Sequence, residues 1–143
     1  MTRLDDLFKE LDHDINIKDD RGKVIALHLY IEEWVNEILK QFAGTPEIKA
    51  RLSFWKKVKM VYAVGLIDDL LLHNISCINK LRNLYSHQRK PSKDKIEEII
   101  AEMKERPCYE WGWEATKLEG ICVLTMMELD DIYESLKKSR KPV

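Results

Sequence analysis

The sequence has few residues that interrupt helices, since only five glycines and four prolines occur among 143 residues. Sheet proteins built from many tight turns need more of both, so this scarcity argues against an all-β fold. Hydrophobic residues make up 45% of the chain and charged residues 34%, which is typical of amphipathic helices around a core. A chain of this length fits one domain. We therefore predict a single all-α domain over residues 1–143, a bundle of about five to six helices with a basic tail at 137–143.

Cysteine is also scarce. The three cysteines, Cys77, Cys108 and Cys122, are widely spaced, odd in number and without a C-x-x-C pair. This pattern indicates neither a disulfide framework nor a zinc knuckle, so reduced thiols are expected. No sequence pattern indicates a cofactor.

Long hydrophobic runs are absent. No window approaches the roughly 18 consecutive apolar residues of a membrane span, and the N-terminus has Asp5 and Asp6 where a signal peptide needs a basic start and an apolar run. We expect a cytoplasmic protein with no membrane partner.

Hydrophobic residues recur at steps of three and four in six segments, which predicts six helices. Thr45 and Pro46 are typical of a helix start, and Gly65 of a helix end, so a single helix is expected between them. The expected helices cover about 4–11, 23–42, 45–65, 68–90, 92–107 and 116–138.

Positive charge is concentrated in residues 80–95. Six cations and one acid, Asp94, leave a local balance of +5 in a chain whose net charge is −1. Such a local field attracts phosphates even in a nearly neutral protein. The residues expected to bind phosphate or nucleic acid are Lys80, Arg89, Lys90, Lys93 and Lys95.

The same segment contains the stretch Ile78 to His87, in which Arg82 and His87 are separated by four residues and Asn83 follows the arginine. An arginine can hold two phosphate oxygens, and a histidine can gain or lose a proton near neutral pH. The pattern predicts RNA cleavage without a metal, with Arg82 stabilising the phosphorane, His87 as general acid or base, and Asn83 orienting its neighbours.

Helix geometry restricts this hypothesis. Arg82 and His87 lie about 140° apart around a regular helix, so one unbroken helix does not aim both at one atom. Either the helix frays before His87 or a second subunit contributes its own copy. The alternative is structural, because arginine and histidine in a last helical turn also stabilise the end of the helix.

Other candidate sites are weaker. Asp69 and His73 are one turn apart but have no third metal ligand at a suitable spacing. Cys77 is expected to be a buried thiol, and Asn74 lies on the apolar stripe of its helix. Trp111 and Trp113 are suited either to stacking on bases or to covering the end of the core. No segment has the pattern of a DNA-recognition helix.

Three stretches together resemble a known family: Leu52-Ser53-Phe54-Trp55-Lys56-Lys57-Val58, Tyr62-Ala63-Val64-Gly65-Leu66-Ile67, and Ile78 to His87. Over about residues 20–138 the chain is similar to the mannitol operon repressor family, a branch of the HEPN (higher eukaryotes and prokaryotes nucleotide-binding) superfamily. The resemblance implies an all-α bundle and a homodimer. For Arg82, Asn83 and His87 it implies a metal-independent ribonuclease site at the dimer interface.

The resemblance leaves two functions open. One is binding or cleavage of RNA, or binding of a nucleotide, as in many HEPN toxins and defence proteins. The other is non-catalytic transcriptional regulation of the mannitol-repressor kind, through a protein partner. An antitoxin or a regulator is the protein partner that these two readings imply.

Overall fold

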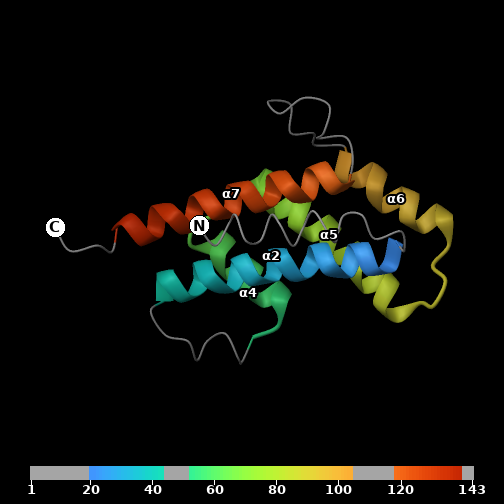
Figure 1. The fold of residues 1–143 in the computed structure, drawn as a ribbon, viewed down its shortest axis with the longest axis horizontal. Coiled ribbons are helices and arrows are strands. Elements are labelled where there is room, and N and C mark those ends of the chain that lie inside the picture. The colour runs from blue at the N-terminus through green and yellow to red at the C-terminus, as the bar shows by residue number, and fades with distance from the viewer. Residues whose placement is uncertain (1–19, 44–51, 105–117, 140–143) are drawn as a thin grey trace.

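A computed structural model describes residues 20–43, 52–104 and 118–139 of the chain, which form α-helices connected by turns (Figure 1). The prediction of an all-α bundle is confirmed, because this part of the chain contains no strand. None of its helices is long and apolar enough to cross a membrane. The helices are α2 (Asp20–Ala43), α4 (Phe54–Ala63), α5 (Asp69–His87), α6 (Lys93–Lys104) and α7 (Leu118–Ser139).

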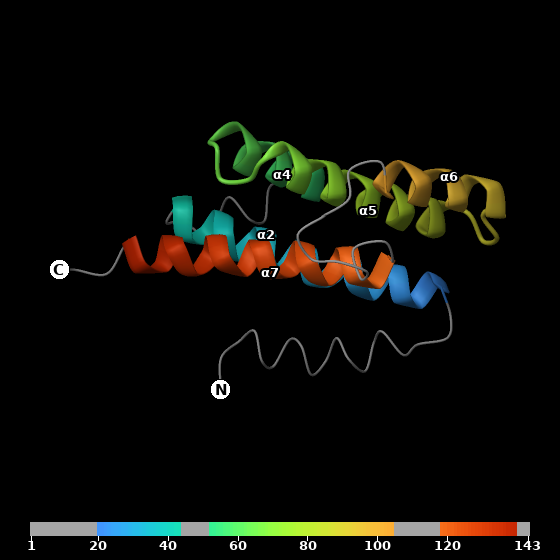
Figure 2. The same cartoon turned by 90° about the horizontal axis from the view of Figure 1, so that it is seen from above.

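The helices form two layers. Helices α2 and α7 lie side by side in one layer, while α4, α5 and α6 form the other (Figures 1 and 2). Helix α2 is central, because it packs against α7 within its own layer and against α5 and α4 across the interface. Helix α5 in turn contacts α2, α4, α6 and α7. The helix that carries the candidate motif is therefore held by the four other helices that the structure describes.

The core lies between the two layers, where the apolar stripes of α2 and α5 meet. The α5 stripe is buried as predicted, including the polar Asn74. Removing such side chains from water provides most of the stabilisation of a bundle of this size. The largest fully buried side chains are Trp34, Leu27, Ile31, Ile38, Leu71, Ile75, Ile78, Leu81, Met103 and Met126.

Helix α5 has clear physical boundaries. Asp68 caps its start, where the side-chain carboxylate accepts a hydrogen bond from the backbone N–H of Leu71 at 2.8 Å. The last helical residue is His87, after which Gln88 adopts extended backbone and Pro91 follows. Ser92 caps α6, because its hydroxyl accepts a hydrogen bond from the backbone N–H of Lys95 at 3.2 Å.

The prediction of one continuous helix over 45–65 is wrong at Leu52 and Ser53, which are not helical. Helix α4 begins at Phe54, where the Ser53 hydroxyl accepts a hydrogen bond from the N–H of Lys56. Its end agrees with the prediction, since Gly65 adopts a left-handed φ of +81° just after the cap.

Two apolar side chains that fit the three- and four-residue spacing of their helices, and are therefore expected to be buried, are instead exposed. Phe42, near the end of α2, is 45% exposed, and Tyr62, in the last turn of α4, is 40% exposed. The Tyr62 hydroxyl donates to Asp69, which holds its ring at the surface, and Val61 takes the buried position.

Several predictions concern residues outside the described ranges. They include the first helix at 4–11, the start of the third at Thr45 and Pro46, the aromatic pair Trp111 and Trp113, and the tail beyond Ser139. These remain predictions.

Candidate functional site

The motif residues lie in the last turns of α5, as predicted, but they face different surroundings. Arg82 is half-buried, whereas His87 is exposed at the C-terminal end of the helix. The helix is regular through His87, so the two side chains leave its axis about 140° apart. Of the two routes to convergence, a fray before His87 is absent from α5. A composite site therefore requires a second subunit.

The side chains of Arg82 and Asn83 contact each other. The Nη1 of Arg82 donates a hydrogen bond to the Oδ1 of Asn83 at 3.2 Å. This interaction restricts the guanidinium, which would otherwise sample many rotamers, and so reduces the entropy lost when the guanidinium binds a ligand. Asn83 is thus in contact with Arg82, while its role in orienting the arginine for chemistry stays a prediction.

A buried histidine lies beside this arginine. His28 on α2 is only 2% exposed, and its Nε2 is 3.2 Å from the Oδ1 of Asn79 on α5. Its ring packs on Phe54 of α4, with centroids 4.5 Å apart, and its Nδ1 is 3.9 Å from a Glu32 oxygen. We call His28, Asn79 and Arg82 the inner polar cluster, because it joins α2 to the motif-bearing turns of α5.

The surroundings of His28 keep it neutral. Burial lowers the pKa of His28 below its ordinary value of 6.5, and the positive charge of Arg82 lowers it further. The hydrogen bond to Asn79 and the charge of Glu32 act in the opposite direction without cancelling the effect. A neutral imidazole can donate from Nε2 to Asn79 while adding no second positive charge next to Arg82.

This environment predicts a pH dependence of stability. The unfolded chain binds a proton on His28 at a higher pH than the folded chain does, so the free energy of unfolding should fall as pH drops below about 6.5. The loss should continue down to the folded pKa and then stop. Urea unfolding between pH 5 and 8 should show this slope in wild type and a flatter one in His28→Gln. The matched control is His87→Gln, which removes an exposed imidazole. If His28→Gln kept the wild-type slope, the pH dependence of stability could not be assigned to His28.

The chain just after His87 is held by α2. The Nη2 of Arg21 donates to the backbone carbonyl of Gln88 at 2.6 Å and also contacts the carbonyl of Arg89. Charge-assisted hydrogen bonds of this kind are roughly twice as strong as neutral ones. Arg21 therefore fixes the direction in which the chain leaves α5, directly beside His87.

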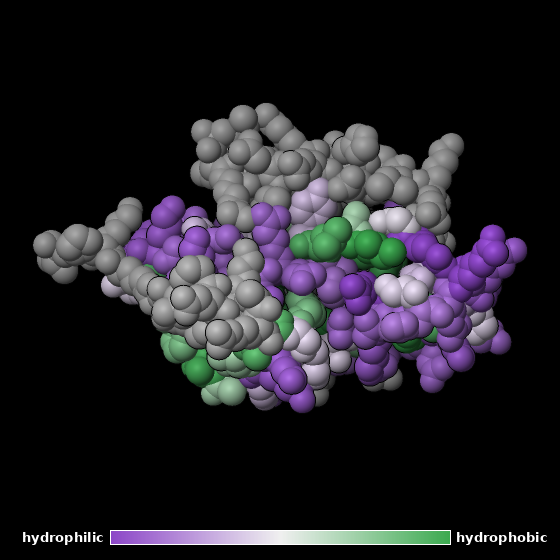
Figure 3. Space-filling view, turned by 90° about the horizontal axis from the view of Figure 1, so that it is seen from below, coloured by the Kyte–Doolittle hydropathy of each residue, from purple (hydrophilic) through white to green (hydrophobic). Residues whose placement is uncertain are grey.

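The predicted phosphate-binding residues divide into two groups. Lys80 forms an ion pair with Glu102 of α6, with Nζ and Oε1 2.8 Å apart, so its charge is largely compensated. Arg89, Lys90, Lys93 and Lys95 are exposed in the α5–α6 connection and the first turn of α6. We call these four residues the basic connection. They occupy the hydrophilic end of the molecule on the right of Figure 3.

The remaining candidates have structural contacts. Asp69 accepts a hydrogen bond from the Tyr62 hydroxyl at 2.5 Å, and the Nε2 of His73 lies 2.9 Å from the carbonyl oxygen of Glu102. Cys77 is buried, as predicted, with its sulfur 3.9 Å from the same nitrogen. Within the described ranges, no three His, Cys, Asp or Glu residues gather in a way that could hold a metal.

Sequence reasoning did not identify Arg21, His28 or Asn79 as neighbours of the motif. A signal for His28 was present, because it follows Val24 by four residues and precedes Ile31 by three, on the buried stripe of α2. A histidine at such a position needs a polar partner from another helix. Arg21 left no comparable signal, since its acceptors are backbone carbonyls 67 and 68 residues away.

Comparison of the chain with protein-family models, with curated proteins and with solved structures finds no match.

Proposed function

We propose that this protein binds and cleaves RNA without a metal, as a homodimer in which Arg82 of one subunit and His87 of the other act on the same phosphodiester. The observation that supports this most is the placement of the motif. A guanidinium restrained by Asn83 and an exposed imidazole occupy the last turns of one regular helix, next to the basic connection. Phosphate binding and proton transfer are thereby available at one end of the molecule.

The proposed chemistry is an intramolecular phosphoryl transfer. The ribose 2′-hydroxyl loses its proton to a base, and its oxygen attacks the adjacent phosphorus in line with the bond to the 5′-oxygen. That bond breaks, the 5′-oxygen takes up a proton, and a 2′,3′-cyclic phosphate and a 5′-hydroxyl remain. His87 serves as one of the two proton-transfer groups, and Arg82 stabilises the charge that develops on the phosphorane oxygens.

RNA affinity should depend on the basic connection and on salt. Removal of one phosphate-binding side chain should reduce the slope of log affinity against log salt by about 0.7 for single-stranded RNA. We expect replacement of Arg89, Lys90, Lys93 and Lys95 by serine to weaken binding and flatten this slope. Fluorescence anisotropy with a labelled single-stranded RNA at several salt concentrations measures both effects.

The matched control for that experiment is Lys56→Ser with Lys59→Ser, which removes two exposed lysines of α4. This variant should retain the wild-type slope. Equal loss of affinity in both variants would indicate unspecific attraction to positive charge, and binding of no RNA by the folded wild type would contradict the proposal.

A second function is supported by the surroundings of Arg82. Its charge acts on the buried His28, and its guanidinium bonds within its own helix, as an arginine that only stabilises the α2–α5 contact would do. The protein would then be a non-catalytic regulator that acts through a protein partner. Capture of the same partner by wild type and Arg82→Ala, together with no RNA binding, would favour this function.

A further inference from the structure

The C-terminal end of α4 exposes three large apolar side chains within five residues. Met60 is 37% exposed, Tyr62 40% and Val64 48%. Met60 and Val64 are one helical turn apart and share a side of the helix, whereas Tyr62 lies on the opposite side, where its hydroxyl bonds to Asp69. We call Met60 and Val64 the turn surface. Clustered exposed apolar residues on an otherwise charged protein are typical of an interaction site.

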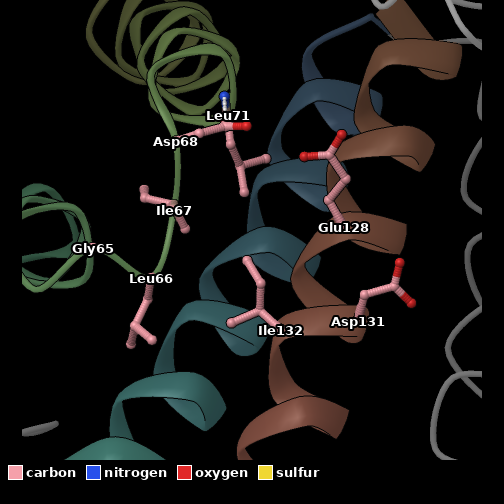
Figure 4. Close-up of a pocket in the computed structure, with 8 residues that line it drawn as sticks. All are labelled: Gly65, Leu66, Ile67, Asp68, Leu71, Glu128, Asp131 and Ile132. Carbon is pink, nitrogen blue, oxygen red and sulfur yellow. Dashed lines mark hydrogen bonds between the residues drawn. The ribbon is translucent and has the colours of Figure 1, made fainter.

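A cavity of about 360 Å³ lies next to the turn surface, between the α4–α5 turn and α7. Its apolar wall comes from Leu66, Ile67, Leu71 and Ile132, and Leu71 and Ile132 point toward each other across the gap in Figure 4. Gly65 forms part of the wall, and an added Cβ there would meet no atom within 4 Å. The cavity is thus large enough to accept one or two apolar side chains from outside.

The rim of this cavity is acidic. Glu128 and Asp131 of α7 and Asp68 of α5 line it, with the Glu128 carboxylate above the gap and the Asp131 carboxylate turned outward (Figure 4). Two further acids of α7, Asp130 and Glu134, lie close by in the sequence; burial and, to a smaller extent, the charges of Glu134 and Asp131 raise the pKa of Asp130. The rim would repel an RNA backbone and attract cations. Its ligand therefore differs from that of the basic connection.

We propose that the turn surface and this cavity form a docking site for a basic amphipathic helix of a partner protein. The apolar face of such a helix would place one side chain between Leu71 and Ile132 and cover Val64 and Met60. Its lysines or arginines would lie along Asp68, Glu128 and Asp131. The combination of apolar anchor and complementary charge is the usual basis for recognising a helix in a groove.

A synthetic peptide of about four helical turns, with leucine on one face and lysine on the other, tests this site. Titration into isotopically labelled protein should give saturable binding, with NMR shifts concentrated at residues 60–68 and 128–132. Met60→Ser with Val64→Ser should weaken binding about tenfold, because loss of a buried anchor costs more than about 1 kcal/mol. Glu128→Gln with Asp131→Asn should weaken it by a similar factor at low salt.

Matched controls separate this site from unspecific association. Leu29→Ser removes an apolar residue of α2 that is 59% exposed, and Glu97→Gln removes an exposed acid of α6. Both should bind the peptide as wild type does, and a peptide with glutamate in place of lysine should not bind. The proposal would be overturned if the peptide did not bind saturably or if the NMR shifts were centred elsewhere. It would also be overturned if the control variants lost as much peptide affinity as the test variants. RNA cleavage is not involved in any of these measurements.

Discussion

A dimer that pairs an Arg82→Ala subunit with a His87→Ala subunit is expected to cleave RNA, although neither variant cleaves it alone. Each homodimeric variant lacks one essential group at both sites, and loss of a proton-transfer residue alone reduces the rate about 10²- to 10⁴-fold. In a mixed dimer, the intact Arg82 of one subunit meets the intact His87 of the other. One of the two composite sites is then complete.

Random pairing of the subunits sets the size of the expected recovery. It makes half of the dimers mixed, and each mixed dimer has one complete site of two, so about one quarter of wild-type cleavage should return. The assay uses single-stranded RNA in the presence of a chelator and identifies the 2′,3′-cyclic phosphate on the product. Subunits are exchanged by denaturing and refolding the two variants together, with each refolded alone as the control.

The outcomes distinguish three arrangements. If the co-refolded mixture recovers about one quarter of wild-type cleavage, the site is shared between subunits. If neither variant cleaves RNA and the mixture does not recover cleavage, Arg82 and His87 of one chain act together. A regular α5 helix does not allow that arrangement without rearrangement. Cleavage by no species, with wild type folded and dimeric, would contradict the ribonuclease proposal and favour the regulatory function.

The position of the motif was accessible from sequence because it depends on local interactions. Asp68, the apolar spacing through Leu81, and Pro91 define α5 within one segment, so its start and end followed from short-range chemistry. The continuous helix predicted over 45–65 shows the limit of this reasoning. Thr45, Pro46 and Gly65 have the residue types of a helix start and end, but Ser53 between them also has the residue type of a cap, and it caps a helix that begins at Phe54.

The neighbours of the motif depend on contacts distant in sequence, and these were not predictable. The inner polar cluster forms because α2 and α5 bring His28 and Asn79 together across 51 residues. Likewise, a count of charges along residues 80–95 includes Lys80 as a free cation, whereas in the structure α6 packs against α5 and places Glu102 beside Lys80. A local charge count therefore overestimated the positive field, and the basic connection is what remains of it.

Replacing Trp34 with alanine is expected to cause the largest loss of stability among single changes in the described core. Trp34 is 1% exposed on α2, and its ring meets Tyr133 of α7 edge to face, with centroids 5.6 Å apart. Tryptophan-to-alanine changes at such positions cost about 3–5 kcal/mol, because the ring no longer packs against its neighbours and a cavity remains. The free energy of unfolding of a domain of this kind is about 5–15 kcal/mol in total, so the variant should be close to unfolding.

Urea unfolding followed by far-UV circular dichroism measures this loss, because helix content does not depend on the tryptophan that is removed. The measurement is made at two protein concentrations, since dissociation of a dimer would shift the midpoint. Leu29→Ala on the same helix changes a 59% exposed residue and should alter stability by less than about 0.5 kcal/mol. A cost for Trp34→Ala no larger than that of Leu29→Ala would mean that α2 and α7 do not pack as described. Because α2 also supplies Arg21 and His28, that result would remove the support for the motif on α5 as well.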